Sequence, residues 1–141
     1  MDFVVGYYVF TAEQYFLHTV QHTSFCTKHK HRHHRTYDAK DITKIKRNFS
    51  LYDNLDLYFN GNIVVLLGNS FIFPMKTMGF QLILAYLSYY FHNEYHTNNS
   101  IWEKWRFFRY LKRKHHIHHL NPSKNHFLID PIFDIIFGTY G

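Results

Sequence analysis

Apolar and polar positions divide the chain into segments of different character. Residues 3–34 open with the apolar, aromatic stretch from Phe3 to Phe10, and the pattern predicts one long helical stretch that runs into the first histidines. Residues 35–60 are charged and polar, with Asn and Asp recurring, which indicates a surface loop with room for a short helix.

The strongest apolar signal lies in residues 62–91. Asn62 to Met75 and Met78 to Phe91 are two mostly apolar runs of 14 residues, separated by Lys76-Thr77, with Pro74 at the break. A straight helix needs about 20 apolar residues to cross a bilayer, so neither run crosses alone. The pattern favours an apolar helical hairpin that dips into one side of a membrane. A buried hairpin in a soluble core is the alternative.

Two shorter segments complete the chain. Aromatic residues alternate with Lys and Arg between Trp102 and Lys114, which predicts a basic, aromatic helix over 101–119 that Asn121-Pro122 ends. The apolar tail from Asn125 to Gly141 follows. At 141 residues the chain is predicted to form a single domain, 1–141. The expected fold class is all-α: a membrane-associated helical bundle with an apolar helical hairpin and a cytosolic, histidine-rich cap.

Charge supports the membrane interpretation. Lys and Arg number 16 against 10 Asp and Glu, and the resulting charge of +6 suits an anionic surface, either nucleic acid or the cytoplasmic face of a membrane. Only Lys76 of these cations lies within the hairpin, so the positive-inside rule places both flanks in the cytosol. Aromatic residues make up 21% of the chain, which also suits the depth of lipid headgroups. The mean hydropathy of −0.34 argues against a typical multi-pass protein but fits partial embedding.

The candidate functional residues are histidines. The chain has 13 histidines, and 12 of them fall in three windows. Residues four apart lie about 40° apart around a helix, so each window can direct several imidazoles to one point. The windows hold His18, His22, His29, His31, His33 and His34; His92 and His96; and His115, His116, His118 and His119.

Such a site would bind two metal ions through imidazole alone. Imidazole suits iron, copper, nickel and zinc alike. Cys26 is the only cysteine, which excludes a Cys2His2 zinc finger and an internal disulfide, and the Glu-x-x-His pairs of carboxylate-bridged diiron bundles are absent. Taken alone, the run from Lys28 to Arg35 could equally be a basic patch or a nonspecific metal-binding tract.

The ordered boxes resemble the fatty acid hydroxylase/sterol desaturase superfamily of membrane diiron enzymes, in which HxxxH, HxxHH, HxxxH and HxxHH follow one another. Here they are His18–His22, a second box ending in His33-His34, His92–His96, and His115 to His119. Lys30 stands where the second box has its first histidine, and either His29 or His31 could substitute. The tail also fits, with an aspartate before Phe137-Gly138-Thr139.

The resemblance implies two iron ions, O2 as co-substrate, and hydroxylation or desaturation of a fatty acyl or sterol lipid. Electrons would come from a donor such as cytochrome b5 or its reductase, since the chain has no GxGxxG motif for a nucleotide cofactor. The boxes would face the cytosol, at the endoplasmic reticulum in a eukaryotic cell. No catalytic residue is expected apart from the metal ligands. These are His18, His22, His29, His31, His33, His34, His92, His96, His115, His118 and His119.

Two other functions fit part of the pattern. The altered second box favours a catalytically inactive membrane scaffold of the same fold. The interleaved aromatic and basic residues at 102–114 would suit a nucleic-acid binder. That function leaves the apolar hairpin and the ordered histidine boxes unexplained, so no nucleic-acid partner is expected.

Overall fold

The computed structural model describes residues 2–23, 33–34 and 57–141, and every regular element in this part of the chain is helical. The all-α expectation is therefore confirmed. The elements, in order, are α1 (Asp2–Gln21), α2 (Leu57–Asn69), α3 (Met75–Tyr95), the 3-10 helix η2 (Ile101–Lys104), α4 (Arg106–Leu120) and α5 (Ile132–Ile136).

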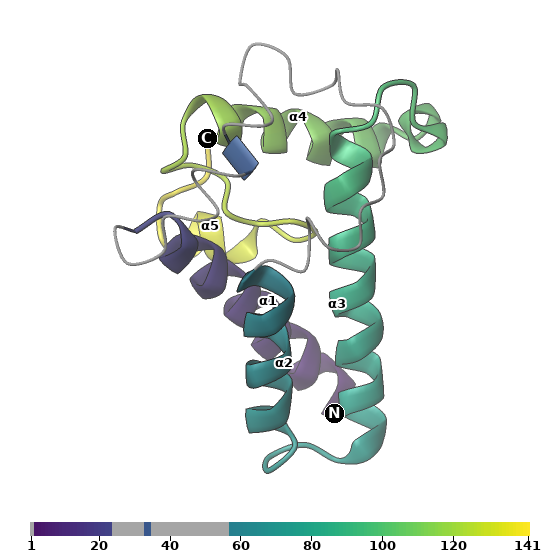
Figure 1. Ribbon diagram of the computed structural model, residues 1–141, viewed down its shortest axis with the longest axis vertical. Coiled ribbons are helices and arrows are strands. Elements are labelled where there is room, and N and C mark those ends of the chain that lie inside the picture. Colours follow the sequence, from purple (N-terminus) through teal and green to yellow (C-terminus); the bar gives the residue numbers. More distant parts are fainter. Residues whose placement is uncertain (1, 24–32, 35–56) are drawn as a thin grey trace.

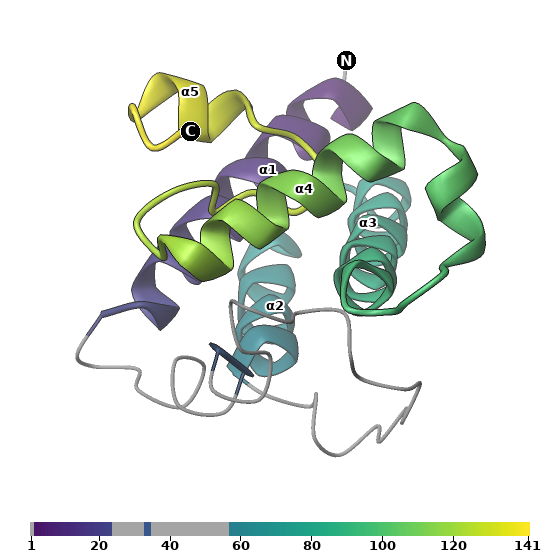
Figure 2. The same cartoon turned by 90° about the horizontal axis from the view of Figure 1, so that it is seen from above.

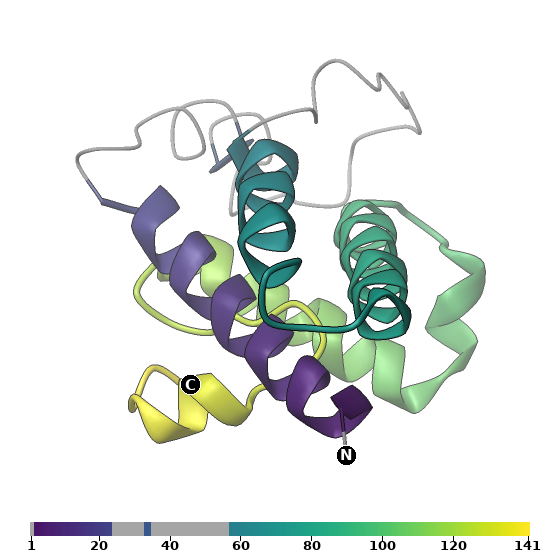
Figure 3. The ribbon, with the colours of Figure 1, turned by 90° about the horizontal axis from the view of Figure 1, so that it is seen from below.

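Three helices form a bundle, and a fourth lies across its end. α2 and α3 run side by side as a hairpin, and α1 packs obliquely against both of them (Figure 1). α4 crosses the end of α3 that lies far from the hairpin turn, and the view from above shows it extending over α1 (Figure 2). α5 packs beside α1, on the side away from α2, as the view from below shows (Figure 3). The far ends of α1 and α3 thus both lie under α4, each beneath a different part of it.

Close approach of α1 to α3 depends on a glycine. A Cβ atom at Gly6 would lie 2.5 Å from Cγ2 of Thr77, so a larger residue would push the two helices apart. The missing side chain also exposes the backbone, and Nε2 of Gln81 donates to the carbonyl of Gly6 at 3.0 Å. This contact sets where the two helices cross, and hence where their far ends lie.

The interior of the three-helix bundle is polar. Nδ2 of Asn69 donates at 3.2 Å both to Oε1 of Gln81 and to Oε2 of Glu13, and Gln14 is hydrogen-bonded to Asn62. All of these side chains except that of Glu13 are buried. Buried polar groups need such partners, because an unpaired one costs about 1–3 kcal/mol. The hydrogen bonds therefore hold the three helices together from the inside.

The outside of the same bundle is apolar. Large hydrophobic side chains on α2, α3 and the turn between them are exposed, including Val64 at 69%, Phe71 at 92% and Met75 at 86%. Phe3, Val4 and Tyr8 extend the surface along α1. This distribution reverses the usual arrangement of a soluble bundle, in which apolar residues face the core.

Where α4 covers the bundle, apolar side chains are buried in the interior, as in an ordinary soluble protein. Tyr95, Phe108, Leu111 and Phe127 form a buried apolar cluster between α3, α4 and the segment after α4. The hydroxyl of Tyr95 donates to the carbonyl of Leu128 at 2.7 Å, so this buried ring also satisfies its polar group. The cluster joins α4 to the end of α3.

Three predicted boundaries were wrong. The long helix expected over 3–34 ends at Gln21, and a turn follows. The hairpin turns at 70–74, so Lys76-Thr77 lies inside α3, because Pro74 suits the position just before a helix, where no backbone N–H is needed. The helix expected over 101–119 is broken at Trp105, whose extended backbone separates η2 from α4. The loop predicted for 35–60 lies almost wholly outside the described residues.

No helix within the described residues combines the length and the apolar character needed to span a bilayer. This agrees with the expectation that neither apolar run of the hairpin crosses alone.

Candidate metal centre

The structure gathers the predicted histidines into two groups that could each hold a metal ion. One ligand nitrogen from each member of a group lies within 4.8 Å of those of the other members. The first cluster is His33, His96, His115 and His119, and the second cluster is His18, His22 and His118. His29 and His31 lie outside the described residues, so the choice between them in the second box stays open.

Helical spacing explains how few elements supply so many ligands. His18 and His22 lie at the end of α1, and His92 and His96 at the end of α3, four residues apart in each case. α4 serves both clusters, because adjacent helical residues point about 100° apart. His118 thus reaches the second cluster while His119 reaches the first.

Nitrogen–nitrogen distances in the first cluster fit metal ligation. Nε2 of His115 lies 2.9 Å from Nε2 of His96 and 3.1 Å from Nε2 of His119. Beside them, Nε2 of His92 lies 3.1 Å from Nε2 of His33. Metal–nitrogen bonds of about 2.0–2.1 Å place neighbouring ligand nitrogens roughly 3 Å apart, and two lone pairs this close need a proton or a cation between them. The donor set therefore fits a metal ion.

The second cluster adjoins the first. Nε2 of His118 lies 2.9 Å from Nε2 of His22, and the ring of His18 lies 4.5 Å from that of His118. His34 lies at the junction: its ring is 4.7 Å from that of His22 and stacks on that of His119 at 4.2 Å. Two metal ions bound here would be close neighbours.

Backbone carbonyls orient two histidines of the second cluster. Nδ1 of His18 donates to the carbonyl of His126 at 2.6 Å, and Nδ1 of His118 donates to the carbonyl of Lys124 at 2.7 Å. A carbonyl only accepts, so each ring carries its proton on Nδ1. Nε2 then keeps a lone pair for a metal ion.

Burial keeps His92, His115 and His118 neutral. Desolvation, with a smaller contribution from His119, lowers the pKa of His92 to about 3. Desolvation and the neighbouring imidazoles also hold the pKa of His115 and that of His118 well below the ordinary value. Metal ions bind the neutral imidazole, so the site is prepared for ligation at neutral pH.

Two residues of the site were missed from the sequence. The ring of His126 is buried 5.5 Å from that of His118 and 5.8 Å from that of His18. Asp134 is fully buried, and its carboxylate accepts from the backbone N–H of His126 and of Phe127, each at 2.8 Å. His126 lies outside the helical boxes, so spacing gave no signal for it. The aspartate was noted only as part of the tail.

Glu94, between His92 and His96 in sequence, belongs to neither cluster, as its helical position predicts. Its buried carboxylate instead accepts a hydrogen bond from the hydroxyl of Ser100, the residue that caps η2. Glu94 thus ties the end of α3 to the next element.

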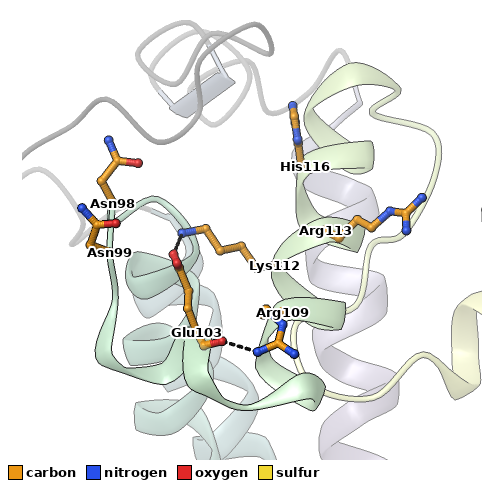
Figure 4. A pocket seen from close by; sticks show the side chains of 7 residues that line it. All are labelled: Asn98, Asn99, Glu103, Arg109, Lys112, Arg113 and His116. Atoms are coloured by element: carbon orange, nitrogen blue, oxygen red, sulfur yellow. Dashed lines mark hydrogen bonds and ion pairs between the residues drawn. The ribbon is translucent and has the colours of Figure 1, made fainter.

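The other face of α4 carries positive charge and a separate pocket of about 390 Å³. Figure 4 shows Lys112 and Arg109 turned toward Glu103, with Nζ of Lys112 donating to its carboxylate and Nη1 of Arg109 to its carbonyl, each at 2.6 Å. His116 lines this pocket together with Asn98, Asn99 and Arg113. It is the one histidine of the last window that is in neither cluster. α4 therefore separates a neutral histidine face from a cationic one.

The model of the fatty acid hydroxylase family matches residues 3–139, nearly the whole chain, so the chain belongs to this family. The resemblance seen in the histidine boxes is confirmed. No curated protein and no solved structure matches the chain.

Proposed function

From its membership of the fatty acid hydroxylase family, we propose that the chain is a non-heme diiron enzyme that uses O2 to hydroxylate or desaturate a fatty acyl or sterol lipid at a membrane. The observation that carries the proposal is the pair of adjoining histidine clusters, which share α4 and meet at His34.

The proposed ligands divide between the clusters. His33, His96, His115 and His119 would hold one iron ion, with His92 beside them. His18, His22 and His118 would hold the other, with His34 at the junction. When bound, the pair of ions would supply the ability to activate O2 toward an unactivated C–H bond. The chain's own part is to keep these imidazoles neutral, directed inward and shielded from water.

The surface of the three-helix bundle supports a lipid environment. Its exposed face is apolar while its interior is joined by buried amide hydrogen bonds, and apolar surroundings require this because they offer backbone and side chains no other partners. In the proposed arrangement the hairpin turn at 70–74 enters one leaflet. The histidine clusters lie at the opposite end of α3, toward the cytosol, where an aromatic lipid-facing rim continues with Trp105 and Phe107.

Reducing equivalents would arrive from a separate protein, such as cytochrome b5 or its reductase. The cationic face of α4 supports docking of an acidic donor there, because His116 and Arg109 on that face belong to the same helix as the ligands His115, His118 and His119. An electron accepted at this surface would have only the width of one helix to cross.

The experiment measures metal and product together. The full chain is extracted in mild detergent, reconstituted anaerobically with Fe(II), and assayed for iron per chain by mass spectrometry. It is then incubated with a reductase system, O2 and a panel of fatty acyl and sterol lipids. We expect two iron ions per chain and an oxidised lipid. His116→Ala, on the same helix but in neither cluster, is the matched control for metal binding and should keep both iron ions.

An inactive scaffold of the same fold is the second candidate, favoured by Lys30 in the second box. Metal without product on any lipid would support the scaffold. Little iron after reconstitution, with the helices intact by circular dichroism, would exclude the diiron proposal altogether.

A further inference from the structure

The segment that follows α4 folds into a turn whose backbone faces the second cluster. Its two carbonyls, those of Lys124 and His126, accept from His118 and His18 respectively, although these histidines come from different helices. Asn125 lies between the two carbonyls with a φ of 53°, in the left-handed region that Asn tolerates better than most residues. This conformation turns both carbonyls toward the cluster.

A buried carboxylate holds that turn in place. Asp134 accepts from the N–H of His126 and of Phe127 at 2.8 Å and from the hydroxyl of Thr139 at 2.6 Å, and its side chain is fully buried. Hydrogen bonds to a charged acceptor are stronger than those between neutral groups. The carboxylate therefore fixes the peptide that carries the acceptor for His18.

Asn125 holds the other side of the turn. Its N–H donates to the carbonyl of Thr139 at 3.0 Å, and its side chain accepts from the N–H of Gly141 at 3.0 Å. The side chain of Asn125 is fully buried. The turn is thus fastened to residues 139–141 on one side and to Asp134 on the other.

We propose that Asp134 and Asn125 are positioning residues for the second cluster: by fixing the carbonyls of His126 and Lys124, they set the tautomer and the direction of His18 and His118. This deepens the proposed function, since it assigns roles to residues outside the ligand set. The first cluster would not depend on this device, because its members contact one another through α3, α4 and the His33-His34 pair.

The test uses the full chain in detergent, without metal and then with Co(II) as a spectroscopic probe. Nitrogen NMR of histidine-labelled metal-free chain reports the tautomers, with His18→Gln and His118→Gln assigning the signals. Anaerobic Co(II) titration resolves the binding steps, and the His118→Gln variant identifies the step that belongs to the second cluster.

For Asp134→Asn we expect that step to weaken about 10- to 100-fold, the usual effect of losing an outer partner of a metal ligand. The step of the first cluster should not change, and the fixed Nδ1–H tautomer of His18 should be lost. The matched control is Asp130→Asn: Asp130 lies in the same segment but accepts from Tyr7 and from the N–H of Ile132 rather than from the turn. It should leave both steps as they are.

If Asp134→Asn does not fold, Thr139→Val removes one donor to the carboxylate without changing the size of the side chain. It should weaken the same step roughly 2- to 10-fold, the range expected for one hydrogen bond. Equal weakening of both steps in these variants, or no change in either, would overturn the positioning role. Co(II) binding without lipid oxidation would count against the proposed function alone. If no metal binds, the histidine tautomers measured by NMR still test the positioning role.

Discussion

The two clusters are built from the same side chain but are held in different ways. In the first, the ring of His115 lies against that of Tyr95 at 5.5 Å, which in turn packs on Phe108, so the aromatic core under α4 supports the ligands. In the second, His18 and His22 lie at the very end of α1, and backbone carbonyls of a turn hold His18 and His118. Packing positions one group, and hydrogen bonds from a loop position the other.

The comparison shows two ways to orient a buried histidine. A ring inside a packed helix pair is restricted by its neighbours, and Nδ1 of His115 is buried without a hydrogen-bonding partner within the described part of the chain. The rings of His18 and His118 are equally buried, but a backbone carbonyl accepts from Nδ1 of each and so fixes its rotamer and tautomer. Each cluster should therefore respond to a different set of substitutions.

The largest expected effect is the loss of one metal ion on replacing either of two adjacent residues of α4, His118 or His119. His119→Ala should lose the metal ion of the first cluster, and His118→Ala that of the second, because each removes a ligand from one group only. Metal per chain after reconstitution measures both, and the double variant should retain neither ion. If each single variant lost both ions, the clusters would form one indivisible site, and the comparison would fail.

Replacing Tyr95 tests the packed support of the first cluster. Tyr95→Ala removes a buried ring and should cost about 3–5 kcal/mol of stability, by analogy with other buried aromatic residues. It should also weaken the Co(II)-binding step of the first cluster more than that of the second. Tyr95→Phe keeps the ring and loses only the hydrogen bond to Leu128, so it should cost about 1 kcal/mol and leave both steps nearly intact. Thermal unfolding and Co(II) titration measure the two effects.

His126→Ala tests whether the ring of His126 is support or ligand. The ring is buried beside the second cluster, but its nitrogens are outside the group whose ligand atoms lie within 4.8 Å. Its removal should cost roughly 2 kcal/mol of stability through the cavity it leaves, with the metal count unchanged at saturating Fe(II). Loss of one iron per chain would make His126 a ligand and enlarge the second cluster.

The smallest expected effect distinguishes the role of the backbone conformation of Asn125 from that of its side chain. Both Asn125→Gly and Asn125→Ala lose the hydrogen bond with Gly141, but only glycine keeps easy access to a positive φ. The alanine variant should be less stable than the glycine variant by about 1 kcal/mol, and its second-cluster step should be the weaker of the two. Equal behaviour would show that the direction of the turn does not matter to the ligands.

Much of the site could be predicted because helical spacing is local. The pairs His18–His22 and His92–His96 share a face at any position in the fold, and His116 was not among the expected ligands. The family, the all-helical class and nine of the proposed ligands within the described residues followed from this spacing and from the order of the boxes. His126 and Asp134 did not, because their relation to the ligands runs through backbone atoms of a turn.

The sequence by itself determined the all-helical class, the apolar hairpin and the histidines that share each helix face, since all of these depend on a period of 3.6 residues and on neighbours along the chain. Only the tertiary structure decided that His118 and His119 serve different clusters, because that depends on where α4 crosses the ends of α1 and α3. The polar interior of the bundle and the turn at Asn125 likewise depend on the tertiary structure. Their hydrogen bonds join residues far apart in the chain, such as Gly6 with Gln81 and His18 with His126, and no local pattern encodes such pairs.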